Sequence, residues 1–166
     1  MELWKKESEA RASLAELKGI ANIIPNQAIL VNAIILQEAK DSSEIENIIT
    51  TRDELYQAIS SSKSVDHATK EVMYYREALN WGYKRIEEKG YISEKDIIEI
   101  QEILLKNDTG IRKTPGTRLY NEKTREIVYS PPDDIETIYK LLKNLFEYLN
   151  DEESSLIKMG IIHYQF

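Results

Sequence analysis

The stretch DDIETIYKLLKNLFEYL, residues 133–149, carries the clearest structural signal in this chain of 166 residues. Its apolar side chains recur at intervals of three and four residues, the spacing that brings side chains to one face of a helix. The two aspartates at its start suit the positive end of a helix dipole. The stretch therefore predicts an amphipathic helix, whose apolar face consists of Ile135, Ile138, Leu141, Leu142, Leu145, Phe146 and Leu149.

Helical patterns also dominate the rest of the chain. They cover residues 5–22, 27–40, 52–59, 66–88, 93–104 and 156–166. The second pattern is followed by Asp41-Ser42-Ser43. Because short polar residues favour turns, we expect that helix to stop there and residues 44–47 to form a short acidic turn of their own.

Several helix ends have recognisable capping residues. Thr51 and Glu54 have the spacing of a capping box, which predicts a helix start. Gly90 follows the long pattern as a helix stop, and Ser93 precedes the next pattern as an N-cap. These signals fix the borders of three helices in the middle of the chain.

Residues 107–132 do not suit a helix, because they contain two glycines and three prolines. Two short runs rich in aromatic and β-branched residues, 118–120 and 127–129, flank a polar turn. This arrangement predicts one β-hairpin within residues 115–130. The fold class expected from the sequence is therefore mainly α, a helical bundle with a single hairpin.

The composition excludes several classes of protein. The chain has no cysteine, which excludes disulfide scaffolds, thiolate zinc sites and cysteine nucleophiles, and it has only two histidines, His67 and His163. The net charge of −7 argues against nonspecific nucleic-acid binding. No apolar run reaches the roughly 18–20 residues of a membrane span, and no signal peptide is evident. We expect a soluble, cytoplasmic protein with no membrane or nucleic-acid partner for this portion.

Residues 36–47, LQEAKDSSEIEN, resemble the inhibitory-helix pattern [ST]-x-x-x-E-[GN] of the Fic family. Ser42 fills the first position of the pattern, Glu46 the glutamate and Asn47 the last position. The upstream stretch ELKGIANIIPN, residues 16–26, also resembles the N-terminal segment of these proteins.

Two later stretches resemble the same family. Residues 109–132 are similar to its flap hairpin, which ends in a double proline, and residues 158–166 resemble the helix that leads into the signature HPFxDGNGRxxR. The signature itself does not occur in the 166 residues. We therefore expect a chain truncated just before it, and we do not take His163 for the catalytic histidine. On its apolar pattern, His163 is expected to be a packing residue.

The resemblance implies a C-terminally incomplete Fic-like bundle in two parts. Residues 1–60 would be an N-terminal segment with the inhibitory helix, and residues 61–166 the front of the core, with a polar loop at 60–64 and the flap at about 115–130. The implied function is that of a self-inhibited protein adenylyltransferase, which transfers AMP from ATP to a Ser, Thr or Tyr hydroxyl of a target protein. The chain is expected to be inactive without the signature.

The resemblance assigns no catalytic and no metal-binding residue to this chain. Its inhibitory, nucleotide-site residues would be Glu46, Ser42 and Asn47, with the Glu46 carboxylate holding a signature arginine that otherwise binds the γ-phosphate. The flap would bind the target protein through Arg118, Leu119, Tyr120, Ile127, Val128 and Tyr129. ATP and Mg²⁺ are implied for the complete protein, with none expected bound by this chain, and a homo-oligomer is possible.

Other interpretations are open from the sequence alone. Ser43 and Glu46 also have capping-box spacing, which would make Glu46 a structural residue. The chain can alternatively be a non-catalytic binding or regulatory fragment. A third alternative keeps the fold but changes the reaction to removal of AMP, with Glu46 as a base, or to another donor nucleotide.

Overall fold

Helices dominate the computed structural model, which describes residues 1–60, 65–151 and 156–166. The helices are α1 (Glu2–Ala21), α2 (Gln27–Ile45), α3 (Arg52–Ser60), α4 (His67–Lys89), α5 (Glu94–Leu105), α6 (Ile135–Leu149) and α7 (Leu156–Gln165). The strands are β1 (Leu119–Tyr120) and β2 (Ile127–Tyr129). The mainly-α fold with one β-hairpin is confirmed. Apart from Ser60, the polar loop expected at 60–64 lies outside the described residues.

The caps expected in the middle of the chain are present. Thr51 and Glu54 form a capping box, in which the Thr51 amide donates to Glu54 Oε2 at 2.8 Å and the Glu54 amide donates to Thr51 Oγ1 at 3.2 Å. Gly90 ends α4 in the left-handed conformation with φ 76°, which glycine adopts without steric cost. Ser93 caps α5 in a second capping box with Asp96.

Helix α2 is longer than the sequence suggested, and the expected break at Asp41-Ser42-Ser43 is wrong. The helix continues to Ile45 because its buried stripe continues, through Ile35, Ala39 and Ser43 at intervals of one turn. The small residues on this stripe let α2 lie against α4. No separate short helix carries residues 44–47.

The exposed face of α2 is held in helical form by side-chain pairs one turn apart. Gln37 donates to Asp41 at 2.7 Å, and Lys40 pairs with Glu44 at 2.9 Å. Pairs at this spacing stabilise a helix surface by a few tenths of a kcal/mol each, roughly 0.2–0.5 kcal/mol. They offset the weak helix preference of the polar residues that were expected to end the helix.

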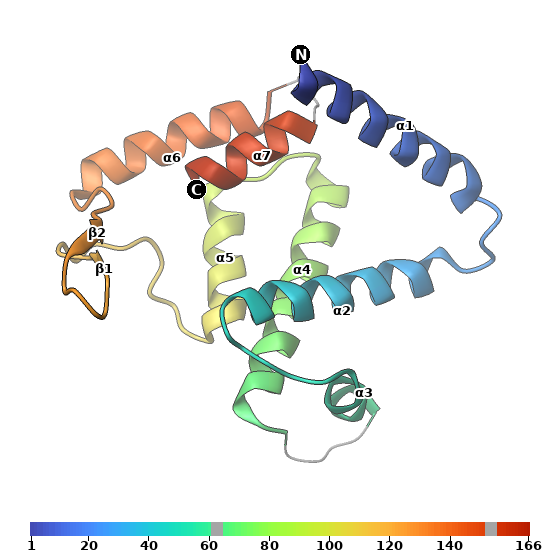
Figure 1. Ribbon diagram of the computed structural model, residues 1–166, viewed down its shortest axis with the longest axis horizontal. Coiled ribbons are helices and arrows are strands. Elements are labelled where there is room, and N and C mark those ends of the chain that lie inside the picture. The colour runs from blue at the N-terminus through green and yellow to red at the C-terminus, as the bar shows by residue number, and fades with distance from the viewer. Residues whose placement is uncertain (61–64, 152–155) are drawn as a thin grey trace.

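The hydrophobic core lies where α2, α3 and α4 meet. Ala39, Leu55 and Val72 are almost completely buried, and Ile48 and Tyr75 are among the side chains packed around them. Helix α2 crosses α4, and α5 runs beside α4 (Figure 1). Where α5 meets α4, a Cβ added at Gly82 would lie only 3.4 Å from the Ile100 side chain. The absence of a side chain at Gly82 therefore lets α5 come close to α4.

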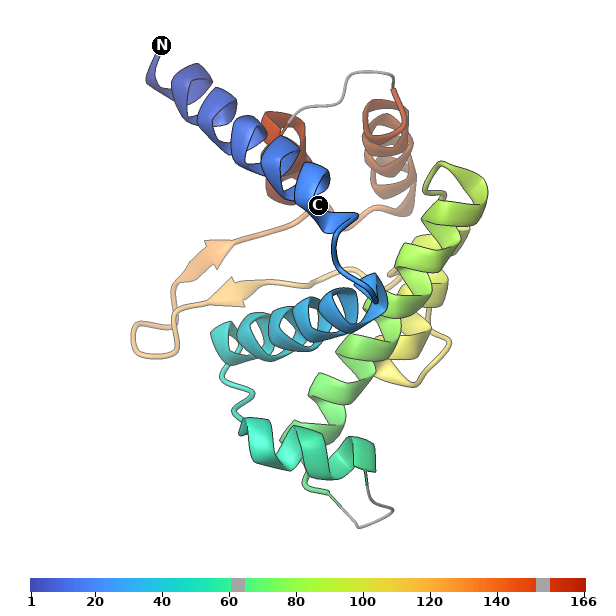
Figure 2. The same cartoon turned by 90° about the vertical axis from the view of Figure 1, so that its right-hand side faces the viewer.

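The hairpin projects from the helical body (Figure 2). Leu119 pairs with Tyr129 and Tyr120 with Ile127, which leaves Val128 as the extra residue of an irregular step. The turn closes through the Asn121 amide, which donates to the Glu126 carbonyl at 2.9 Å. The hairpin therefore stands away from the core and is held mainly by its own pairing.

The molecule is open, with many apolar side chains in contact with solvent. No residue of α1 is buried, and α1 contacts α7. His163 on α7 is exposed, so the expectation that it is a packing residue is wrong. His67 is the first residue of α4, and its Nδ1 lies 3.0 Å from Glu71 Oε1. None of the helices in the described ranges is long and apolar enough to cross a membrane.

Candidate functional site

Glu46 lies at the carboxyl end of α2, as the residue that follows its last helical turn. Its backbone has φ −86° and ψ 14°, and its side chain is exposed. Among the described residues, no hydrogen bond or ion pair uses the Glu46 carboxylate. The group is thus an ionisable side chain that faces solvent with its full hydrogen-bonding capacity available.

The electrostatic setting of this carboxylate is unusual for a residue that only stabilises a helix. A helix carries partial negative charge at its carboxyl end, where acidic side chains are unfavourable and basic ones are favoured. The last turn of α2 contains no basic residue. The carboxylate and the helix end therefore reinforce each other, and together they favour a cation such as a guanidinium.

The backbone around Glu46 forms a Schellman motif, the six-residue helix stop with two crossed hydrogen bonds. The Ile48 amide donates to the Ser43 carbonyl at 3.0 Å, and the Asn47 amide donates to the Glu44 carbonyl at 3.1 Å. Asn47 has φ 62°, in the left-handed region that asparagine tolerates better than most residues. The last position of the inhibitory pattern is thus the residue that ends the helix.

Ser42, the first residue of the pattern, faces the preceding turn. Its hydroxyl donates to Glu38 Oε1 at 2.7 Å and it is half-buried. Ser42 therefore lies inside α2 and not at the end of a separate short helix. The capping-box interpretation of Ser43 and Glu46 is wrong, since Ser43 is buried near the end of a helix and not at its start.

The segment after Glu46 is tied to the core at both ends. Ile48 packs against the cluster of Ala39, Leu55 and Val72. Two residues later, Thr50 is 4 % exposed and its hydroxyl lies 2.6 Å from the hydroxyl of Thr69, which is fully buried. Either hydroxyl can be the donor. These contacts hold the chain from Glu46 to α3 against the start of α4.

Two carboxylates beside this segment have lowered pKa values. Hydrogen bonds from the side chain and backbone of Thr51 lower the pKa of Glu54. Hydrogen bonds from the side chain and backbone of Thr69 lower the pKa of Asp66, which caps α4. Both groups are therefore ionised around neutral pH and serve as hydrogen-bond acceptors for the threonines.

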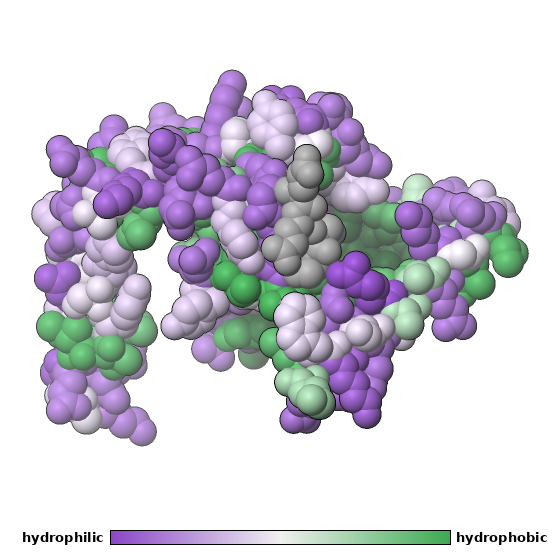
Figure 3. Space-filling view, turned by 90° about the horizontal axis from the view of Figure 1, so that it is seen from above, coloured by the Kyte–Doolittle hydropathy of each residue, from purple (hydrophilic) through white to green (hydrophobic). Residues whose placement is uncertain are grey.

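The flap residues lie on the projecting hairpin. Five of them are more than half exposed, namely Leu119, Tyr120, Ile127, Val128 and Tyr129. A band of apolar side chains is visible across the projection in the space-filling view (Figure 3). Arg118 is half-buried, and a guanidinium nitrogen of Arg118 lies 3.6 Å from Asp133 Oδ2. Among the described residues, no hydrogen bond or ion pair links these side chains to Glu46.

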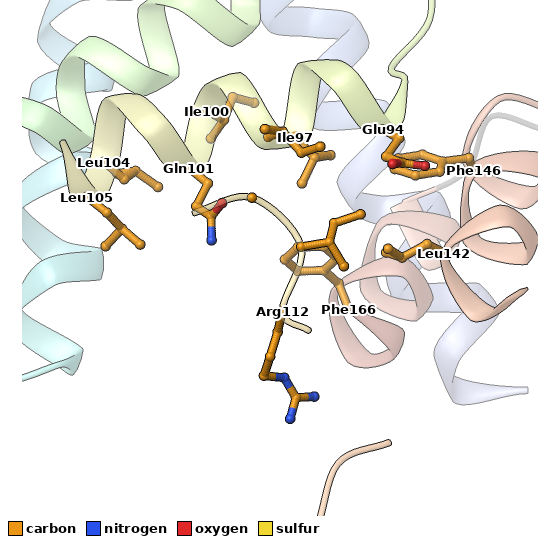
Figure 4. Close-up of a pocket in the computed structure, with 13 residues that line it drawn as sticks. Glu94, Ile97, Ile100, Gln101, Leu104, Leu105, Arg112, Leu142, Phe146 and Phe166 are labelled. Carbon is orange, nitrogen blue, oxygen red and sulfur yellow. The ribbon is translucent and has the colours of Figure 1, made fainter. Parts of the chain in front are cut away.

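An apolar groove, which the sequence did not reveal, lies between α5, residues 110–112, α6 and the chain end (Figure 4). It encloses about 410 Å³, and Ile97, Leu142 and Phe166 are among its walls. Arg112 extends away from these side chains, and its guanidinium donates to the Pro132 carbonyl at 2.6 Å. That bond ties the two ends of the hairpin segment together. The groove contains too few polar groups to hold a triphosphate.

The family resemblance implies Mg²⁺ for the complete protein. In residues 1–60, 65–151 and 156–166 there is no group of three or more His, Cys, Asp or Glu side chains that suits a metal ion. The described residues therefore do not fit the ion.

Residues 4–84 match the family model for the N-terminal region of the Fic/DOC family. The matched range runs from α1 into α4 and includes Ser42, Glu46 and Asn47, as well as the Thr50–Thr69 contact. The hairpin and the helices α5 to α7 lie beyond it.

Proposed function

Because residues 4–84 make this chain a member of the Fic/DOC family, we propose that it forms the control and target-presenting portion of a self-inhibited protein adenylyltransferase. The observation that carries the proposal is the exposed Glu46 carboxylate, which has no partner among the described residues and stands on a fixed helix end. In this proposal Glu46 pairs with the arginine of the family signature that otherwise holds the γ-phosphate of ATP.

The chemistry of the pair supports this assignment. A carboxylate and a guanidinium form two parallel hydrogen bonds, and such charge-assisted bonds contribute roughly 1.5–3 kcal/mol. The negative end of α2 adds to the attraction for a guanidinium. With its arginine held by Glu46, the site cannot seat the triphosphate for attack on the α-phosphorus.

The hairpin supports the second part of the proposal. A two-stranded hairpin has two edges with unpaired N–H and C=O groups, and an extended segment of a target protein can add to one of them as a further strand. Backbone pairing of this kind orients a target hydroxyl with little dependence on target sequence. The exposed apolar side chains of Leu119, Ile127 and Val128 add contact area beside the pairing groups.

The reaction proposed for the complete site is a nucleotidyl transfer. The target hydroxyl forms a bond to the α-phosphorus of ATP, the bond to pyrophosphate breaks, and the hydroxyl proton passes to a base. The 166 residues contain no signature loop, so this chain supplies neither that base nor the phosphate-binding backbone. Its own part is to restrain the reaction through Glu46 and to present the target through the hairpin.

The proposal is tested by the rate of self-labelling with radioactive ATP in the protein translated from the complete reading frame. Glu46→Gly is expected to raise the rate about tenfold to a hundredfold, which corresponds to the loss of one charge-assisted pair. The matched control is Glu44→Gly, which removes a nearby carboxylate that pairs with Lys40 and is expected to leave the rate within about twofold.

Two outcomes contradict the proposal. An unchanged rate in Glu46→Gly with a lowered melting temperature would make Glu46 a structural residue. A lowered rate of AMP removal from a labelled target, with no gain in labelling, would make Glu46 a base for hydrolysis. The 166-residue chain alone, assayed in parallel, is expected to show no labelling above heat-denatured protein.

A further inference from the structure

The buried contact between Thr50 and Thr69 has no explanation in helix capping alone. Thr69 is the third residue of α4, and its amide donates to the N-cap Asp66 at 2.8 Å. The start of α4 is therefore complete without Thr50.

Helix α6 provides a direct comparison within the same molecule. Thr137 occupies the same position in α6, and its amide donates to the N-cap Asp134 at 2.8 Å. At the start of α4 the Thr69 hydroxyl also lies 2.6 Å from the Thr50 hydroxyl, whereas no such second hydroxyl meets Thr137 among the described residues. That additional bond restrains the segment that contains Thr50, and the start of α4, where Thr69 lies, does not need it.

The segment in question runs from Glu46 to Thr50 and is only five residues long. At its start, the amides of Glu46 and Ile48 both donate to the Ser43 carbonyl at 3.0 Å. At its end, Thr50 is held between Thr69 and the carboxylate of Glu54, which lies 3.3 Å from its hydroxyl. Between these ends, Ile48 packs on the core while Ile49 is exposed.

A hydroxyl pair in such a place favours one geometry over others. Two buried hydroxyls must meet at hydrogen-bonding distance, whereas two methyl groups in their place can slide past each other. Replacing both partners of a buried hydrogen bond by apolar groups of the same shape is close to neutral for stability. Two hydroxyls in place of two apolar side chains therefore favour a fixed position of the segment more than they favour stability.

We propose that Thr50 and Thr69 are positioning residues that fix the Glu46 carboxylate by clamping the segment that leaves α2 to the start of α4. The inference deepens the proposed function and rests on it for its effect on catalysis, although the clamp itself is a property of this fold. Neither threonine contacts ATP or the target in this account. Their action passes through the backbone of residues 46–48.

The first test is amide hydrogen exchange in the protein translated from the complete reading frame, followed in peptides that cover residues 44–50. The double variant Thr50→Val/Thr69→Val is expected to raise exchange there by about threefold to tenfold, the effect of losing one net hydrogen bond. Thr137→Val is the matched control and is expected to leave these peptides unchanged. Thr69→Ser keeps the hydroxyl and is expected to exchange like the unchanged protein.

The second test is a double-mutant cycle in which the self-labelling rate is measured. Its expected result would not be seen if the two threonines had a merely structural role. The double valine variant is expected to raise the rate about threefold to tenfold when Glu46 is present and to have no effect when Glu46→Gly is already made. Unchanged exchange in residues 44–50, or an equal gain in the Glu46→Gly background, would overturn the inference. If exchange increases but Glu46→Gly leaves the self-labelling rate unchanged, the result would support the clamp and overturn the proposed function instead.

Discussion

At the scale of single residues, the inhibitory pattern separates into parts with different physical roles. Asn47 ends α2 through a left-handed backbone, and Ser42 bonds Glu38 within the helix. Glu46 alone has a charged group without a partner among the described residues, at a helix end that disfavours it. The pattern therefore describes a helix stop that displays one carboxylate.

This division predicts how Asn47 responds to substitution. Asn47→Gly is expected to leave stability unchanged or to raise it by up to about 1 kcal/mol, because glycine adopts a φ of 62° without strain. Asn47→Ala is expected to cost about 1 kcal/mol, since its Cβ opposes that backbone conformation. Thermal unfolding of the 166-residue chain measures both. Equal losses in the two variants would show that the amide side chain matters and the backbone does not.

At the scale of helices and strands, the sequence correctly predicted the features that depend on local chemistry. The capping box of Thr51 and Glu54, the stop at Gly90 and the hairpin follow from residues close in the chain. The continuation of α2 through Ser43 depends on burial against α4, which polar composition conceals. The exposure of His163 depends likewise on what α7 packs against, and an apolar pattern does not specify a partner.

The junction of α4 and α5 allows a test at this scale, because it contains a buried charge. Asp96 is 3 % exposed and accepts from Lys89 at 2.7 Å and Arg85 at 3.3 Å. Burial acts to raise the pKa of Asp96, but hydrogen bonds from Lys89 and Ser93 outweigh it and hold the pKa well below the usual 3.8.

The sign of the pH effect follows from this lowered pKa. Between the folded and unfolded pKa values the unfolded chain binds the extra proton, so the stability that Asp96 contributes is present above about pH 4 and is lost as the pH falls below it. Asp96→Asn is expected to cost about 2–3 kcal/mol at pH 7 and to flatten the fall in stability below about pH 4.

Urea denaturation at several pH values provides the measurement. The control is Glu147→Gln, in an exposed pair with Lys143, which is expected to change stability by no more than about 0.5 kcal/mol. An Asp96→Asn profile parallel to that of the unchanged chain would show that other groups cause the acid sensitivity.

At the scale of the whole molecule, the fold is open, and much of its surface is exposed to solvent. The accessible surface is 12927 Å², against roughly 8,500 Å² for a compact monomer of this mass. The most buried side chains gather where α2, α3 and α4 meet. That is also where the segment after Glu46 is anchored, so the proposed control element stands on the best-packed part of the molecule.

The central claim, that Glu46 holds an arginine away from the γ-phosphate, is tested most directly by comparing ATP and ADP binding. The protein translated from the complete reading frame and its Glu46→Gly variant are titrated with each nucleotide by calorimetry. We expect Glu46→Gly to tighten ATP binding about tenfold or more and to leave ADP binding unchanged, because ADP has no γ-phosphate. Equal changes for both nucleotides, or none for ATP, would contradict the account.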